Sequence, residues 1–179
     1  FRRCAPPPKA SPSNAGSGVS LMGDRLRASY PPYSAILIGA PLWGLQMLAS
    51  AMSTLYARNG LETSHVGDLA LLYFAGGLLT WPFALMLGRF FAHKRRIETR
   101  FAAFFVALSA CTILMTAFLF AMDYRVFYSR WHAPGGSMIW FFQFIFTGAS
   151  SVYQFMALGL RLFVPLGLVC LLATSFALA

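Results

Sequence analysis

The sequence contains few charged residues, and acidic residues are the scarcest of them. Of its 179 residues only 11% are charged, and just five are Asp or Glu. Soluble domains carry about 25% charged residues. Hydrophobic residues instead make up 58% of the chain and gather in runs that exceed a soluble core helix. The composition therefore excludes an ordinary soluble domain and indicates an integral membrane protein.

Strands of the kind that form membrane barrels are also missing from the sequence. Such strands alternate polar and apolar residues over about ten positions, whereas residues 69–75 (LALLYFA) are apolar throughout. Backbone groups in lipid must be hydrogen-bonded internally, which leaves helices as the spanning elements. We expect an all-α integral membrane protein, a bundle of about five transmembrane helices with a disordered N-terminal tail. The expected spans cover residues 34–57, 68–91, 101–122, 138–157 and 162–179.

Motifs that carry chemistry are absent from the sequence as well. The cysteines Cys4, Cys111 and Cys170 are far apart and form no Cys-x-x-Cys pair, so neither a disulfide framework nor a cysteine metal site is indicated. No pattern for nucleotides, phosphates or hydrolytic triads occurs. The sequence therefore predicts no cofactor and favours a protein that is not an enzyme.

The first 30 residues differ in composition from the rest of the chain. Residues 1–30 are rich in Pro, Ser and Gly and carry five Lys or Arg. They hold too little apolar surface to offset the entropy of ordering, so we expect a disordered tail ahead of a membrane domain at residues 31–179. The tail could be cytoplasmic, an organellar transit segment, or translated sequence upstream of a true start at Met22. We expect it to be dispensable for insertion.

A basic run between the second and third expected spans sets the orientation. Its cations Lys94, Arg95, Arg96 and Arg100 stand between two long apolar segments, and such loops stay on the cytoplasmic side of a membrane. The resulting topology places 11 of the 14 Lys and Arg inside. We therefore expect the N-terminus inside and the C-terminus outside, in a bacterial inner membrane or alternatively an organellar inner membrane. This flanking role accounts for the formal charge of +9, so no nucleic-acid partner is expected.

The last 42 residues, 138–179, are almost entirely apolar and allow two arrangements. Two helices that turn near residues 158–161 would each cross the membrane. A single long helix kinked near Pro165 is the alternative, and it would leave Arg161 in lipid at a cost of a few kcal/mol. We favour two helices because one span needs only about 20 residues.

Acidic and imidazole side chains gather on the expected extracytoplasmic side of the membrane, and we call them the outer cluster. Glu62, His65 and Asp68 follow one another at intervals of three residues, and Asp123 ends the third span on the same side. One turn of helix would bring the first three together. Carboxylates and imidazole can bind a divalent transition metal or exchange protons. The alternative is that Ser64 or Asp68 caps a helix and that the other side chains are solvated.

Small residues mark one face of the third expected span. Ala103, Ala107 and Cys111 recur at every fourth position, and small residues let another helix backbone approach closely. We expect this face to pack against a neighbouring helix and Leu108 to lie on the opposite face.

The sequence favours a scaffold or subunit of a membrane complex. A small transporter or channel acting as a homo-oligomer is the alternative. In it, prolines would break the helices and membrane-depth glutamines would line a polar path, although such amides more often hydrogen-bond a neighbouring helix. A second alternative is a membrane enzyme that uses the outer cluster. The expected partners are the lipid bilayer and another membrane protein or a second copy. The prolines and glutamines of the transporter alternative are Pro41, Pro82, Pro165, Gln46, Gln143 and Gln154.

Overall fold

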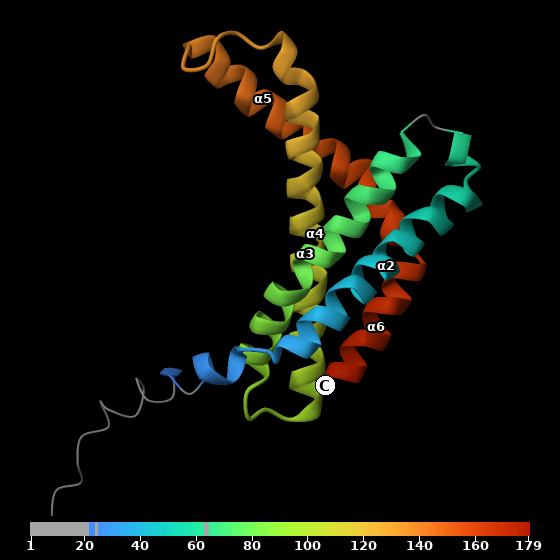
Figure 1. Cartoon of the computed structure of the whole chain (residues 1–179), viewed down its shortest axis with the longest axis vertical. Helices are drawn as coiled ribbons and strands as arrows, with labels where there is room; N and C mark the ends of the chain where they lie inside the picture. The colour runs from blue at the N-terminus through green and yellow to red at the C-terminus, as the bar shows by residue number, and fades with distance from the viewer. Residues whose placement is uncertain (1–21, 24, 63–64) are drawn as a thin grey trace, which may run out of the picture.

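The computed structural model describes residues 22–23, 25–62 and 65–179, and regular structure in this part of the chain is helical throughout. Figure 1 shows the helices as an elongated bundle from which one helical hairpin projects. Most of the tail expected to be disordered lies outside the described residues. Its last part differs from the expectation, since residues 25–29 form a helical turn.

Five long helices and four short ones make up the labelled elements of the described residues. The long helices are α2 (Tyr33–Ala57), α3 (Val66–Ala92), α4 (Ile97–Tyr128), α5 (Met138–Gln154) and α6 (Leu166–Leu178). The short ones are η1 (Gly60–Glu62), η2 (Ser129–Trp131), the π-helical turn η3 (Phe155–Gly159) and η4 (Leu160–Phe163). By length and composition, three of the described helices can each cross a membrane, namely α2, α3 and α4 with η2.

The expectation of five spans is wrong at the C-terminal end. Residues Met138–Phe163 and Leu166–Leu178 form one pair, bent by 71°, that counts as at most one further span. The second member, α6, has 13 residues and reaches only about 20 Å, against a hydrocarbon core of about 30 Å. The arrangement is therefore closer to the alternative of one interrupted helix.

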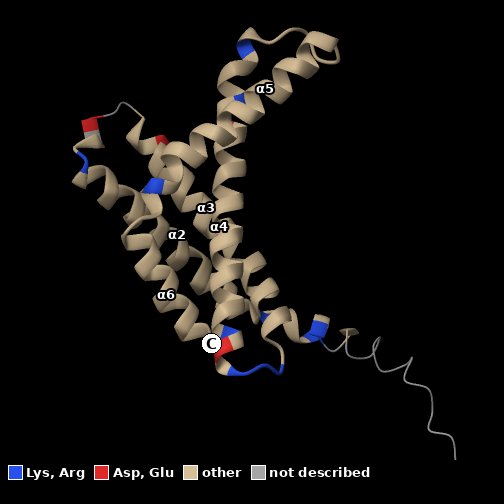
Figure 2. Cartoon of the chain, turned by 180° about the vertical axis from the view of Figure 1, so that it is seen from behind, with Lys and Arg blue, Asp and Glu red and all other residues tan. Residues whose placement is uncertain are grey.

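The last helix returns to the end of the bundle that carries the basic run. Leu178 lines the same pocket as Lys94 and Arg95, and Figure 2 shows the C-terminus beside the Lys and Arg residues of that end. The expectation that the two lie at opposite ends is wrong. The physical reason is that the bent pair covers the length of the bundle once, whereas two full spans would cover it twice.

The third span is longer than its apolar core. Its expected limits were 101–122, but α4 begins at Ile97 and ends at Tyr128, and η2 continues to Trp131. The basic loop is thereby shortened to residues 93–96. Polar residues near a membrane surface do not stop a helix, and the first proline after this span is Pro134.

Glycines allow α2 and α3 to approach closely. A Cβ atom placed on Gly77 would lie 2.9 Å from the Cα of Gly44 and 3.1 Å from the carbonyl oxygen of Trp43. Such a contact between backbones is open only to residues without a side chain. Next to it, the Trp43 and Trp81 rings lie 6.1 Å apart in the core. Their indole N–H groups donate to Thr112 Oγ1 and to the carbonyl of Ala35.

The α3–α4 contact uses small side chains and one hydroxyl bond. A Cβ atom on Gly76 would collide with the side chain of Thr116, and the Thr80 hydroxyl donates to the carbonyl of Cys111 at 3.1 Å. Ala107 is 2% exposed. Leu108 is fully buried, so its expected position on an opposite, lipid-facing side is wrong. On the predicted small face, Ala103 and Cys111 lie half-buried against the core.

Hydroxyl groups of α2 and α3 bond to the backbone around the bend of the C-terminal helix pair. Ser50 Oγ donates to the carbonyl of Leu162 at 3.0 Å and accepts from the Gly167 N–H at 2.9 Å. Thr54 Oγ1 donates to the carbonyl of Val164 at 3.1 Å. The Tyr73 hydroxyl of α3 donates to the carbonyl of Gly159 at 2.6 Å. Backbone groups of an irregular segment at membrane depth must find partners inside the protein, and these side chains supply them.

Replacing Ser50 by Ala tests this interpretation. The variant removes the donor to Leu162 and leaves the buried Gly167 N–H unpaired, so we expect the free energy of unfolding to fall by about 1 to 3 kcal/mol. Ser53→Ala is the matched control, because the Ser53 hydroxyl is exposed and bonds only within its own helix. Unfolding of both variants is measured by detergent titration. Equal losses at the two positions contradict the interpretation.

Candidate functional site

A pocket at the end of the bundle away from the C-terminus brings together part of the predicted outer cluster. His65 and Asp68, at the start of α3, share a pocket of about 450 Å³ with Asp123 of α4. Tyr124, Tyr128 and Arg130 contribute further polar atoms to its lining. Residues from two different helices, expected near one another from the topology alone, thus border one cavity. Glu62 lies in η1, is exposed, and does not line this pocket.

The bonds within this cluster are weak. His65 Nδ1 and Asp68 Oδ2 lie 3.3 Å apart, with side chains 78% and 80% exposed. Exposed ion pairs contribute about 0 to 1 kcal/mol. His65 is the N-cap residue of α3 and makes no side-chain capping bond, while Ser64, the other expected cap, lies outside the described residues.

A metal ion would need more ligands than this geometry offers. Within the described part of the chain, no group of three His, Cys, Asp or Glu side chains is arranged to hold one. What the pocket does present is an imidazole, two carboxylates and two phenols around one cavity. That set can exchange protons with solvent, and a role of this kind for His65 and Asp123 stays a prediction.

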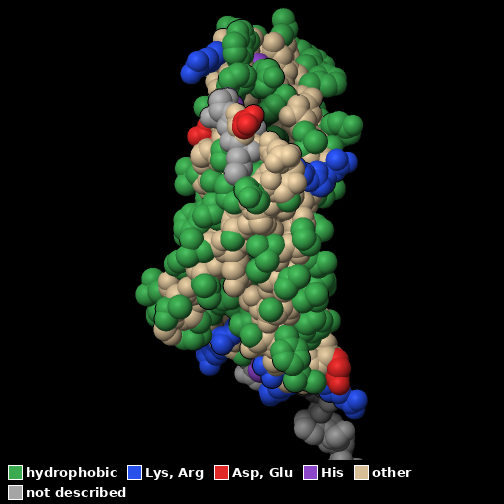
Figure 3. Space-filling view, turned by 90° about the vertical axis from the view of Figure 1, so that its right-hand side faces the viewer, with side chains coloured by type: hydrophobic (Ala, Val, Ile, Leu, Met, Phe, Trp, Pro, Cys, Tyr) green, Lys and Arg blue, Asp and Glu red, His purple; other side chains and the backbone are tan. Residues whose placement is uncertain are grey.

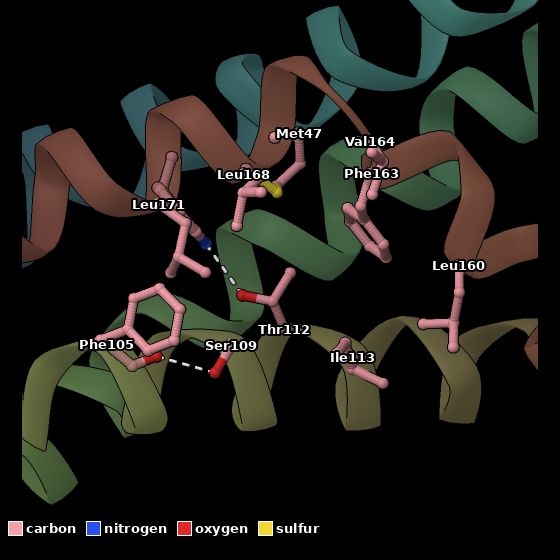
Figure 4. A pocket seen from close by; sticks show the side chains of 12 residues that line it. Met47, Phe105, Ser109, Thr112, Ile113, Leu160, Phe163, Val164, Leu168 and Leu171 are labelled. Atoms are coloured by element: carbon pink, nitrogen blue, oxygen red, sulfur yellow. Dashed lines mark hydrogen bonds between the residues drawn. The ribbon is translucent and has the colours of Figure 1, made fainter. Parts of the chain in front are cut away.

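A second pocket is an apolar groove at the middle of the bundle. It has a volume of about 330 Å³ and lies between α4 on one side and η4 with α6 on the other, over the side chains of Trp43 and Met47. Figure 4 shows Leu168 and Leu171 of α6 facing Phe105 of α4 across it. Its lining is almost entirely apolar. This groove suits an acyl chain and offers no reactive group.

The hydroxyls that border the groove are already engaged. Ser109 Oγ donates to the carbonyl of Phe105 at 2.7 Å, and Thr112 Oγ1 accepts the indole N–H of Trp43 at 3.1 Å. Both bonds are drawn in Figure 4. Both hydroxyls therefore already bond within the bundle.

The three membrane-depth glutamines form hydrogen bonds inside the protein. Gln46 of α2 lies 3.5 Å from the Thr174 hydroxyl of α6. Gln154 Nε2 donates to the Tyr124 hydroxyl at 3.3 Å, and Gln143 Oε1 accepts the Ala133 N–H at 2.8 Å. These bonds agree with the structural interpretation of the amides, in which they join neighbouring segments.

The α4–α5 hairpin is joined along a polar stripe. Gln143, Thr147 and Gln154 recur at helical spacing on α5, and Thr147 Oγ1 lies 3.3 Å from His132 Nε2. Arg125 of α4 lies over the Phe144 ring, 4.0 Å from its centroid. The polar side chains of α5 thus face α4 and the loop that follows it, while large apolar side chains of α5 stay exposed. Those more than half exposed are Met138, Ile139, Phe141, Phe142, Phe146 and Tyr153.

The hydroxyls that bond to the backbone around the bend were not predicted from the sequence. Their spacing could have indicated a polar contact, because Ser50 and Thr54 are four residues apart on one helix face in a largely apolar segment. Their bonding partners could not be predicted, because the carbonyls of Leu162 and Val164 lie 108 to 112 residues away along the chain.

Comparison with protein-family models, with curated proteins and with solved structures finds no match for this chain.

His65→Ala tests whether the outer cluster contributes to stability. The pair with Asp68 is exposed, so the variant should lower the free energy of unfolding by less than about 1 kcal/mol. Thermal unfolding in detergent micelles measures this, with Glu62→Ala as an exposed control. A loss of more than about 2 kcal/mol would contradict the expectation and make His65 a structural residue.

Proposed function

We propose that this chain is a subunit of a membrane assembly and binds a second, helical membrane protein through the outer face of its hairpin. We define the outer face as Ile139, Phe142, Phe146 and Tyr153, four exposed residues of α5 at helical spacing. The observation that carries the proposal is the isolation of α5. Among the described helices it packs on α4 and continues into η3, and Figure 1 shows it standing away from α2 and α3.

The composition of α5 supports a protein partner. Five of the seven residues 140–146 are aromatic, and aromatic side chains are enriched at the cores of protein interfaces. Helices associate in lipid through packing rather than through the hydrophobic effect. A helix with a single helical neighbour leaves most of its circumference open to such packing.

The same contacts argue against a conducting path. The glutamines that could line one are bonded to Thr174, Tyr124 and the Ala133 backbone. The helices α2 and α3 also run without interruption through Pro41 and Pro82. The transporter alternative needs broken helices and exposed polar groups at membrane depth, and these features give it little support.

The orientation forms part of the proposal. We place the end that carries the basic loop and the C-terminus on the cytoplasmic side of a bacterial inner membrane. Seven of the described Lys and Arg residues lie at this end. The other four, Arg58, Arg125, Arg130 and Arg161, lie elsewhere in the described chain. The bias follows the rule that Lys and Arg accumulate on the inner side. The seven are Arg25, Arg27, Arg89, Lys94, Arg95, Arg96 and Arg100.

Photocrosslinking from the outer face tests the proposed contact. A photoreactive amino acid replaces Phe146, which is 68% exposed, and in a matched control replaces Leu37 of α2, which is 74% exposed. After illumination of intact membranes, we expect one defined protein adduct from position 146 and only lipid adducts from position 37. Lipid adducts alone at both positions would overturn the proposal. An adduct of twice the mass of the chain would instead establish self-association.

Reporter fusions test the orientation. Alkaline phosphatase, which is active only outside the cytoplasm, is inserted at Arg96 or attached after Ala179. Because the bent pair spans the bundle once, we expect both fusions to be inactive. An insertion at Gly135, in the loop between η2 and α5 at the opposite end, is the positive control and should give an active enzyme. Activity after Ala179 would restore the five-span topology.

A further inference from the structure

The end of the bundle that carries the C-terminus contains a cationic pocket of about 360 Å³. We call its basic lining the basic rim, formed by Arg89, His93, Lys94, Arg95 and Arg100. These residues come from the last turn of α3, the following loop and the first turn of α4. The loop turns sharply at Lys94, whose φ of 53° is in the left-handed region, so that residues on both sides of the turn border one cavity.

The basic rim forms no ion pair in the described part of the chain, and the nearby carboxylate of Glu98, in the first turn of α4, does not line the pocket. The ion pair in the described part of the chain lies at the other end of the bundle, where it joins His65 to Asp68. Arg89 Nη1 donates to the carbonyl of Tyr30 at 3.0 Å, which uses one of the five N–H donors of a guanidinium group. The pocket therefore attracts an anion.

The other side of the pocket is apolar. Trp81 and Leu85 of α3, Phe104 of α4 and Leu178 of α6 line it, and we call these four residues the apolar floor. Phe104 lies one helical turn beyond Arg100, in the direction of the membrane interior. Figure 3 shows the Lys and Arg side chains at this end next to a broad hydrophobic band. A ligand that fills the pocket must carry negative charge at one end and apolar chains at the other.

We propose that the basic rim binds the phosphate of an anionic phospholipid whose acyl chains lie against the apolar floor. Basic pockets between membrane helices on the cytoplasmic side suit such headgroups. Free phosphate has the same charge chemistry but makes no use of the apolar floor. A cluster that only sets topology would need neither a shared cavity nor a floor.

Two adjacent arginines provide a matched test. Both are exposed, but Arg95 lines the pocket and Arg96 does not. The full chain is purified in uncharged detergent, and native mass spectrometry measures the binding of phosphatidylglycerol, phosphatidylcholine and inorganic phosphate. We expect phosphatidylglycerol to bind at least about tenfold more tightly than phosphatidylcholine. We expect Arg95→Gln to weaken it about fivefold and Arg96→Gln less than about twofold.

A third variant leaves every cation in place. Leu178→Glu adds a carboxylate beside the basic rim, and we expect it to weaken phosphatidylglycerol binding as much as Arg95→Gln does. Circular dichroism and gel filtration verify that each variant is folded. Equal affinity for the two lipids, or equal losses at Arg95 and Arg96, would overturn the proposal. Displacement of the lipid by inorganic phosphate would also overturn it, because the ligand would then be a soluble anion.

Discussion

The structure depends on one requirement, that the backbone of an interrupted span be hydrogen-bonded within the protein. The chain between η4 and α6 leaves the helical path, and lipid offers its carbonyls no partner. Ser50 and Thr54 of α2 and Tyr73 of α3 supply these bonds. Because Ser50 also accepts from the Gly167 N–H, the same residue positions the first turn of α6. The direction of α6, and with it the place of the C-terminus, follows from these contacts.

Polar groups inside the bundle bond to neighbouring segments, while the outside of the bundle is largely apolar. Thr80, Thr112 and the membrane-depth glutamines bond to neighbouring segments, while leucines and phenylalanines cover the outside. This arrangement suits a bilayer, where an unpaired polar group costs more than an exposed methyl group.

Hydropathy predicted where the first two long helices lie, but not where the third ends or how the last 42 residues turn. The first two spans were expected at 34–57 and 68–91, within two residues of α2 and α3, because each is a long apolar segment bounded by polar residues. The end of α4 was misplaced because a helix continues through polar residues at a membrane surface. The count of spans was wrong because 42 apolar residues suffice for two crossings by length, and length contains no information about direction. The spacing of His65 and Asp68 predicted that they would lie together, and the topology predicted that Asp123 would lie near them, but the high exposure of the His65–Asp68 pair could not be predicted from spacing.

Local composition was enough to predict the helical class, three long helices able to cross a membrane and the concentration of cations at one end. Tertiary structure alone decided which backbone groups Ser50 reaches, where the chain bends and which cations share a cavity. Those properties join residues far apart in the chain, as Ser50 and Gly167 are. A one-dimensional pattern records how apolar a segment is, but the free energy that selects a bend comes from hydrogen bonds and packing between segments that meet only in the folded bundle.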